Sequence, residues 1–222
     1  MKENNNHQIS ELEGKSIKFL DKDKVDIRGE LICGANVQID INVIFKGKVE
    51  LGDSVVIGAN TIVNNSVIKS GTKIKDYSLI KNVTIGEHCI IGPFSRLRTG
   101  TKVGDHSNIG TFVEIKNSII GSNCKINHMA FIGDARLGND VIIGAGSITC
   151  NHDGEKSQET IIHSGVYIGS NVNLIAPIEI GENAIIGAGS TISHDAPQNK
   201  LTLERSKEVS IDNKKILNQK NK

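Results

Sequence analysis

The sequence predicts an all-β protein, a parallel β-solenoid with three faces, and three observations carry this prediction. Thirteen of the 23 glycines directly follow Ile, Leu or Val. A run of aliphatic residues is spaced six apart, at Ile85, Ile91, Leu97, Val103, Ile109 and Ile115. Four positions after each aliphatic residue comes a small or β-branched one, such as Cys89 or Ser95. A six-residue period with two inward positions is typical of a parallel β-helix.

A helical interpretation fails on the same residues. Glycine at every sixth position would cost roughly 1 kcal/mol each in a helix interior. The abundance of Val and Ile also favours strands. We therefore expect the glycines to mark tight corners where φ is positive, with no chemical role.

The spacing shortens to five at regular places, which closes a coil of 17 or 18 residues. The first face of the coil carries Leu51, Ile68, Ile85, Val103, Ile120 and Leu137. The second carries Ile57, Ile74, Ile91, Ile109, Ile126 and Ile143. The third carries Val63, Ile80, Leu97, Ile115, Ile132 and Thr149. Like strands should stack about 4.8 Å apart along the axis.

The pattern is interrupted once and resumes at Ile168, Leu174, Ile180, Ile186 and Ile192. Near Glu155 the first face loses its aliphatic position, and the segment from Asn151 to Glu159 is polar. We predict a loop pushed out of the coil there, which is a usual place for function on a rigid scaffold. The predicted organisation is an N-terminal arm over 1–24, a β-helix over 25–200, and a C-terminal arm and mobile tail over 201–222.

Composition limits the classes of function. Aromatic residues make up 3% of the 222 residues and Trp is absent, so the core should consist of stacked Ile, Val and small side chains. A net charge of +1 argues against nucleic-acid binding. No apolar stretch approaches about 18 residues, and the polar start resembles no secretory signal. Cys33, Cys89, Cys124 and Cys150 contain no C-x-x-C pair, and we expect a cytoplasmic protein with Cys89 and Cys124 buried.

A column of cations follows from the register. The position after the aliphatic residue is usually Gly, but on the third face it reads Asn64, Lys81, Arg98, Lys116 and Gly133. Stacked like charges repel, and Arg is suited to bidentate phosphate contacts. The sequence therefore offers two interpretations, a phosphate site and a solvated basic stripe.

Three histidines are candidates for a catalytic or metal-binding role: His88, His106 and His128. His128 lies in the next coil and could reach the same corner, where a proton acceptor near neutral pH would be useful. The alternative is an exposed corner residue. His88 and His106 are 18 residues apart and should stack. They could ligate zinc with a third ligand from a neighbouring subunit, although corner histidines are the simpler interpretation, and we predict no metal.

Long stretches of the chain resemble a known family over residues 25–206. The matching segments are Asp26–Gly29, Ile39–Ile44, Gly92–Gly100, Phe112–Lys116, Ile132–Ala135 and Ile143–Asn151. They resemble the C-terminal half of the bacterial bifunctional enzyme that makes UDP-N-acetylglucosamine. That half is a glucosamine-1-phosphate N-acetyltransferase with a left-handed β-helix. The resemblance implies an acetyl-CoA-dependent enzyme of cell-envelope precursor synthesis that acts as a homotrimer, with each site between subunits and no metal.

The resemblance also implies roles for individual residues. Arg98 and Lys116 correspond to the sugar-phosphate ligands, His128 to the catalytic base, and Asn151 to a sugar-binding residue. The acetyl-CoA contacts correspond to Ser170, Ala188 and Arg205. Several sugar-contacting positions differ from the family pattern, namely Phe131 and Ile142, with His152 and Ser157 in the polar loop. Each lost polar contact would cost about 0.5–1.5 kcal/mol of net binding.

These departures leave the acceptor open. The preferred hypothesis is N-acetylation of glucosamine-1-phosphate. One alternative is a nucleotide-linked or deoxygenated amino sugar, and another is a non-catalytic trimeric scaffold. Because no glycine-rich nucleotide loop lies near the start of the sequence, we also expect no uridyltransferase activity.

Overall fold

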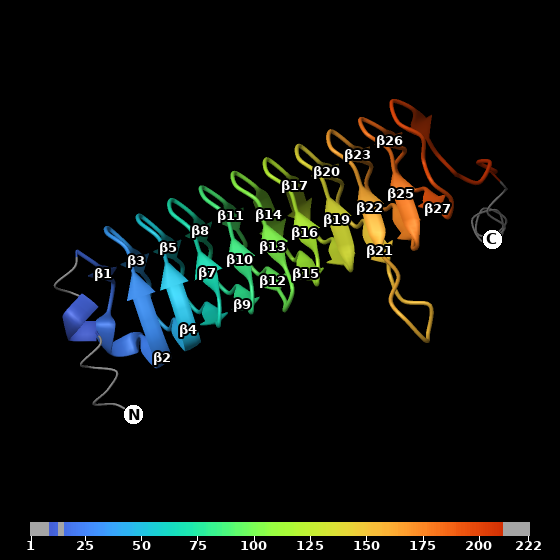
Figure 1. The fold of residues 1–222 in the computed structure, drawn as a ribbon. Helices are drawn as coiled ribbons and strands as arrows, with labels where there is room; N and C mark the ends of the chain where they lie inside the picture. The colour runs from blue at the N-terminus through green and yellow to red at the C-terminus, as the bar shows by residue number, and fades with distance from the viewer. Residues whose placement is uncertain (1–8, 13–15, 211–222) are drawn as a thin grey trace, which may run out of the picture.

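The computed structural model describes residues 9–12 and 16–210, and residues 18–202 wind into a long three-faced solenoid (Figure 1). The named strands all pair in parallel, as β14 (Asn108–Thr111) does with β17 (Lys125–His128). The predicted left-handed parallel β-helix is confirmed. The predicted mobile tail over 211–222, and most of the predicted N-terminal arm before Ser16, lie outside the described residues.

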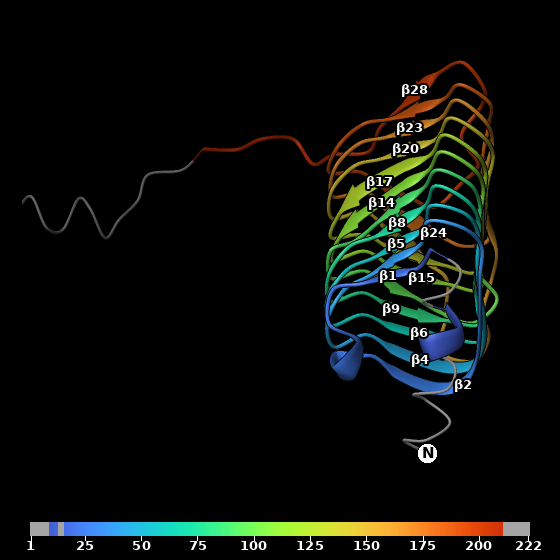
Figure 2. The same cartoon turned by 90° about the vertical axis from the view of Figure 1, so that its left-hand side faces the viewer.

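The second face is a sheet of 11 strands that runs the length of the solenoid (Figure 2). Its strands are β1 (Lys18–Phe19), β3 (Gln38–Ile39), β5 (Val56–Ile57), β8 (Lys73–Ile74), β11 (Ile90–Ile91), β14 (Asn108–Thr111), β17 (Lys125–His128), β20 (Ile142–Ile143), β23 (Tyr167–Ile168), β26 (Ile185–Ile186) and β28 (Leu201–Thr202). Its first and last strands lie outside the range 25–200, so coil pairing extends into both arms.

The first and third faces form one sheet of 17 strands. They are joined because β2 (Asp26–Cys33) and β4 (Ile44–Leu51) run round the corner between them, after a short 3-10 helix, η1 (Lys22–Lys24). The first face continues with β7 (Val67–Ile68), β10 (Thr84–Ile85), β13 (Lys102–Val103), β16 (Ile119–Ile120), β19 (Ala135–Leu137), β22 (Thr160–Ile162) and β25 (Ile178–Ile180). The third continues with β6 (Ile62–Asn64), β9 (Leu79–Lys81), β12 (Arg96–Leu97), β15 (Glu114–Lys116), β18 (Phe131–Gly133), β21 (Ile148–Cys150), β24 (Asn173–Ile175) and β27 (Thr191–Ile192).

The predicted register is confirmed on all three faces. Leu51 pairs with Ile68 on the first face, Ile57 with Ile74 on the second, and Ile115 with Ile132 on the third. These aliphatic side chains point inward and are buried. Each coil therefore stacks its side chains on the equivalent ones of the next, which makes a continuous core without large rings.

The prediction that the first face loses its aliphatic position near Glu155 is wrong. Ile162 pairs with Leu137 and is 1% exposed, so it fills that position. The polar segment is an insertion that leaves the coil after β21 and returns at β22, and it projects clearly from the solenoid (Figure 1). Spacing failed because the insertion lengthens one coil without removing a strand.

The conformational role predicted for the glycines is also largely wrong. Among the glycines that follow an aliphatic residue, only Gly92 has a positive φ in the described chain. The others are required by close coil stacking: a Cβ on Gly144 would lie 2.5 Å from the backbone of Gly169. Left-handed corner positions are filled mostly by Asn and other polar residues, such as Asn117 with a φ of 46°.

Candidate functional site

We call Lys81, Arg98 and Lys116 the cation column. These residues lie on consecutive coils, at the end of the third face where the chain turns toward the first face. Lys81 ends β9, and Lys116 ends β15 and pairs with Gly133 of β18. Arg98 lies between them, because Leu97 pairs with both Ile80 and Ile115. The stacking predicted from the register is therefore confirmed.

Two members of the cation column, Arg98 and Lys116, form ion pairs with carboxylates. Glu114 Oε1 lies 2.8 Å from Arg98 Nη1 and 3.5 Å from Arg96 Nη1. Asp134 Oδ2 lies 3.6 Å from Lys116 Nζ. The Arg98 side chain is 40% exposed, so its ion pair contributes little to stability. Its effect is to orient the guanidinium beside Glu114, in a hollow that Lys116 also lines.

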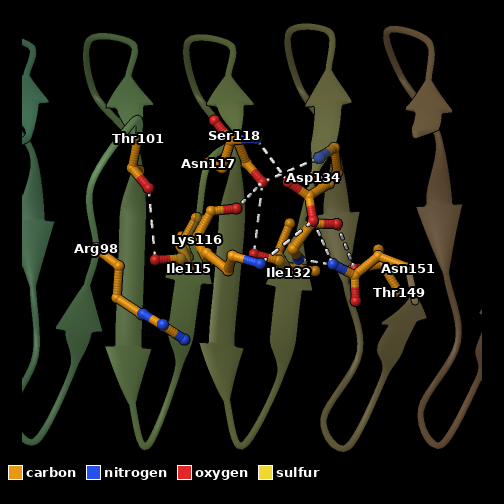
Figure 3. A network of polar contacts seen from close by, with 12 residues as sticks. Arg98, Thr101, Ile115, Lys116, Asn117, Ser118, Ile132, Asp134, Thr149 and Asn151 are labelled. Atoms are coloured by element: carbon orange, nitrogen blue, oxygen red, sulfur yellow. Dashed lines mark hydrogen bonds and ion pairs between the residues drawn. The ribbon is translucent and has the colours of Figure 1, made fainter. Parts of the chain in front are cut away.

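Asp134 is the centre of a polar network at this edge (Figure 3). Asn117 Nδ2 donates to Asp134 Oδ1 over 2.5 Å, and Asn151 Nδ2 donates to Asp134 Oδ2. Burial raises the pKa of the Asp134 carboxyl, but the hydrogen bonds from Asn117 and Asn151 and the nearby Lys116 ammonium lower it more, so the pKa lies below its ordinary value. Asp134 therefore stays charged and fixes both Lys116 and Asn151.

Gly133 leaves a gap in the third face that two predicted site residues fill. A Cβ at Gly133 would lie 2.8 Å from the Phe131 ring and 2.9 Å from Asn151 Nδ2. The ring and the amide therefore lie against the same backbone, one coil beyond Lys116. The structure brings Lys116, Phe131 and Asn151 together, as a site would require.

The polar loop is held close to this group. Asp134 accepts a hydrogen bond from the backbone N–H of Thr160 on its own carbonyl (3.1 Å), just past the loop. Asp153 Oδ1 accepts from the N–H groups of Glu155 and Lys156, both at 2.9 Å. These backbone hydrogen bonds lower the pKa of Asp153. The loop is an ordered turn that begins at Asn151, next to the network.

A second set of predicted residues lies along the corner between the second and third faces. Three backbone hydrogen bonds join neighbouring coils there: Gly146 N to His128 O (3.4 Å), Asn171 N to Ala145 O (2.8 Å), and Gly189 N to Ser170 O (2.8 Å). These bonds make His128, Ala145, Ser170 and Ala188 equivalent positions on successive coils, which we call the corner column. Arg205 lies beside its end, 4.0 Å from a Cβ placed on Gly189.

The two columns border the third face on opposite edges. His128 ends β17 and is exposed, just before the corner that leads to β18. Its ring has no hydrogen-bond or ion-pair partner within the described residues. The sequence suggested that His128 reaches the corner that carries the cations, but the length of a third-face strand, such as β18, separates them.

Ile142 is not part of this group within one chain. It lies on the second face, where it pairs with Lys125 and Tyr167, and it is 37% exposed. A site that includes Ile142 needs a surface from elsewhere, and the chain alone does not supply it.

His88 and His106 stack as predicted, with ring centroids 5.2 Å apart. They lie at the corner between the first and second faces, away from both columns. Among the residues that the structure describes, no three His, Cys, Asp or Glu side chains gather as a metal site would require. Cys89 and Cys124 are buried and free, and burial raises the pKa of both thiols.

Sequence reasoning missed the roles of Glu114 and Asp134. A signal was available for each. Glu114 pairs with Arg96 on the neighbouring coil, so the register placed opposite charges side by side. Asp134 occupies a corner position with positive φ that Asn117 fills one coil earlier, so a carboxylate there replaces an amide.

Comparisons with known proteins point to one family. Residues 27–113 match the family model described as GMPPB C-terminal domain, and residues 159–194 match bacterial transferase hexapeptide (six repeats). The bifunctional protein GlmU of Nitrosomonas eutropha is 49% identical over 199 residues, which is 90% of this chain and 43% of that protein. GlmU of Azoarcus sp. is 44% identical over 195 residues, 88% of this chain and 43% of the relative. The chain thus spans less than half the length of these relatives.

Solved structures support the fold. A UDP-N-acetylglucosamine acyltransferase from Bacteroides fragilis has a TM-score of 0.59 at 21% identity, covering 80% of this chain and 69% of that one. The Arabidopsis UDP-N-acetylglucosamine acyltransferase has a TM-score of 0.55 at 18% identity, covering 84% and 69%. In the described residues, no helix has the length and apolar character needed to cross a membrane.

Proposed function

The chain is a homologue of the acetyltransferase domain of the bifunctional GlmU proteins, and on this premise we propose that it transfers an acetyl group from acetyl-CoA to the amine of glucosamine-1-phosphate. The observation that carries the proposal is the pair of columns on opposite edges of the third face. One edge offers cations for a phosphate, and the other offers an unpartnered histidine in line with the predicted acetyl-CoA contacts.

The phosphate would bind Arg98 and Lys116. Both groups are held in place before any ligand arrives, by Glu114 at 2.8 Å and by Asp134 at 3.6 Å. Charge-assisted hydrogen bonds to phosphate are the strong kind. Anchoring the phosphate fixes the position of the amine, which lowers the barrier by proximity. Asn151 is oriented by the same carboxylate and would contact the sugar.

His128 would act as the base. The amine nitrogen attacks the thioester carbonyl, a C–N bond forms, and the C–S bond to coenzyme A breaks. His128 takes the proton that the nitrogen loses, and this proton then passes from the imidazolium to the departing thiolate, which restores the base. General-base catalysis of this kind contributes about 10²- to 10⁴-fold.

Acetyl-CoA would extend along the corner column from His128 toward Ser170, Ala188 and Arg205. The equivalent positions of consecutive coils are about 4.8 Å apart. The reactive thioester therefore lies at the His128 end and the rest of the cofactor follows the coils toward the C-terminus. Arg205 supplies a cation for the phosphates of coenzyme A.

We further propose that the enzyme is a homotrimer. Tyr77, Phe94, Phe112 and Met129 form an exposed ladder along the same corner as His128, with Tyr77 and Phe94 rings 5.0 Å apart. Phe112 is 61% exposed. A neighbouring subunit that covers this ladder would border the groove beside His128 and could bring a second-face residue such as Ile142 to the site.

A second acceptor class is supported by the changed sugar shell. Phe131 lays an apolar ring over Gly133, and Ile142 presents an exposed aliphatic side chain where the family has an amide. An amino sugar that lacks a hydroxyl, or one linked to a nucleotide, would suit these surfaces.

The four thiols are free, which suits a reducing cytoplasm.

The test is release of free thiol from acetyl-CoA with a panel of amino sugars: glucosamine-1-phosphate, glucosamine and a nucleotide-linked amino sugar. We expect His128→Ala to lower kcat by about 10²- to 10⁴-fold, while the control His194→Ala keeps full activity. An active His128→Ala protein would remove the assigned base. No thiol release with any acceptor, and no acetyl-CoA binding by calorimetry, would favour the non-catalytic scaffold.

The expected lack of uridyltransferase activity stays a prediction. It is checked by incubating the protein with UTP and N-acetylglucosamine-1-phosphate and measuring pyrophosphate.

A further inference from the structure

A surface hollow of about 220 Å³ adjoins the cation column. It is lined by Leu79, Lys81, Arg96, Leu97, Arg98, Thr99 and Lys116. The corner column runs from His128 toward coils nearer the C-terminus, whereas the hollow extends from Lys116 toward coils nearer the N-terminus. A glucosamine-1-phosphate anchored at Arg98 and Lys116 with its amine toward His128 would leave the Lys81 end of the hollow empty.

Lys81 is the member of the cation column whose charge is not neutralised. Arg98 and Arg96 share Glu114, and Lys116 has Asp134. Within the described residues Lys81 has no ion-pair or hydrogen-bond partner for its side chain, and it is exposed. The hollow thus has four cations against two carboxylates, a formal excess of two positive charges, with the unpartnered one at its far end.

The neighbouring hydroxyl is also available to an anion. Thr99 Oγ1 accepts a hydrogen bond from Asn82 Nδ2 over 2.9 Å. Within the described residues the Thr99 hydroxyl donates to no other group, so its proton is available for donation into the hollow. A hydroxyl donor next to Arg98 and one coil from Lys81 adds to the two cations a donor of the kind that phosphoryl oxygens accept from.

We propose that Lys81 and Thr99 form a second phosphoryl subsite next to the one at Arg98 and Lys116, so that the site takes an amino sugar carrying a diphosphate, such as a nucleoside-diphosphate-linked amino sugar. This inference rests on the proposed function. The first phosphoryl group binds Arg98 and Lys116, and the second lies one coil further on, against Lys81. The nucleoside then extends away from the reacting amine.

The test compares phosphate and pyrophosphate binding to the full chain by calorimetry at fixed salt. We expect pyrophosphate to bind roughly tenfold more tightly, as one added charge-assisted hydrogen bond implies. Lys81→Ala should abolish this preference and leave phosphate affinity unchanged. Lys102→Ala, an exposed lysine on the first face, is the matched control and should change neither affinity.

A kinetic comparison separates this inference from the proposed function. With UDP-glucosamine as acceptor, Lys81→Ala should raise KM roughly tenfold, with little effect on KM for glucosamine-1-phosphate. Acetyl transfer that Lys81→Ala leaves unchanged, with equal phosphate and pyrophosphate affinities, would overturn the subsite and leave the function standing. If pyrophosphate binding depends on Lys81 but no acceptor gives thiol release, the subsite stands and the proposed function is overturned.

Discussion

At the scale of single residues, the candidate site depends on the Asp134 carboxylate, which has no part in the proposed chemical step. Asp134 receives two side-chain amides and faces the Lys116 ammonium, and its side chain is 12% exposed. A largely buried acceptor with these partners is costly to disturb. Asp134 is therefore a positioning residue: it sets where Lys116 and Asn151 point, and through them where a sugar phosphate would lie.

We predict that Asp134→Asn lowers Tm by roughly 2 to 8 °C at pH 7, from the loss of charge-assisted hydrogen bonds. The pKa of Asp134 is lowered in the folded chain, so its contribution is present above the ordinary carboxyl pKa and is lost as pH falls through the folded value. The stability gap between the two proteins should therefore close below about pH 4. Thermal melts at fixed protein concentration check this, and a gap that persists unchanged at pH 3 would contradict it.

At the scale of elements, the short strand β18 (Phe131–Gly133) determines what the third face can hold. Its two neighbours in the sheet, β15 and β21, carry Lys116 and the residue before Asn151. Gly133 is in register with Lys116 on the next coil and offers no side chain there. The Phe131 ring and the Asn151 amide occupy the space that a side chain at position 133 would fill. Glycine at this position therefore determines where both groups lie in the candidate site.

Gly133→Ala tests this directly. The new Cβ would meet the Phe131 ring at 2.8 Å and Asn151 Nδ2 at 2.9 Å, and both are able to move. We expect the fold to survive, with KM for the amino-sugar phosphate raised at least about tenfold. Phe131→Ala in the same chain makes room and should recover part of the loss. An unchanged KM in the single variant would show that the gap has no part in binding.

The spacing of aliphatic residues predicts the coil register and the cation column, but it does not predict the insertion after β21 or the position of His128. The six-residue period placed Ile115 against Ile132 and stacked Lys81, Arg98 and Lys116, because register in a solenoid follows from counting. Counting failed at Ile162, since an insertion changes spacing without changing the coil. It also could not distinguish the two edges of a face, so His128 was expected nearer the cations than it lies.

At the scale of the whole molecule, the solenoid leaves exposed an apolar ladder that a single chain does not cover. Tyr77, Phe94, Phe112 and Met129 stand on consecutive coils of one corner, each between 46% and 62% exposed. Large contiguous apolar patches on a protein surface mark interaction sites. Their position beside His128 is the reason for expecting the site to be completed by a neighbouring subunit.

We predict that the wild-type chain has the mass of a trimer in light scattering after size exclusion, and that Phe112→Ser shifts it toward the monomer. Acetyl transfer should fall in proportion, because the groove beside His128 would lose one wall. Ile119→Ser, at an exposed aliphatic side chain on the first face, is the control. A monomeric wild type with full activity would refute assembly as a requirement.

The most direct measurement of the central claim is a comparison of KM for both substrates in variants of the two edges. Arg98→Ala should raise KM for glucosamine-1-phosphate about tenfold or more, with KM for acetyl-CoA unchanged. Arg205→Ala should do the opposite. This split would place the phosphate and the cofactor on opposite edges of the third face. If both variants raise both KM values equally, or neither changes any, the assignment of the two columns is wrong.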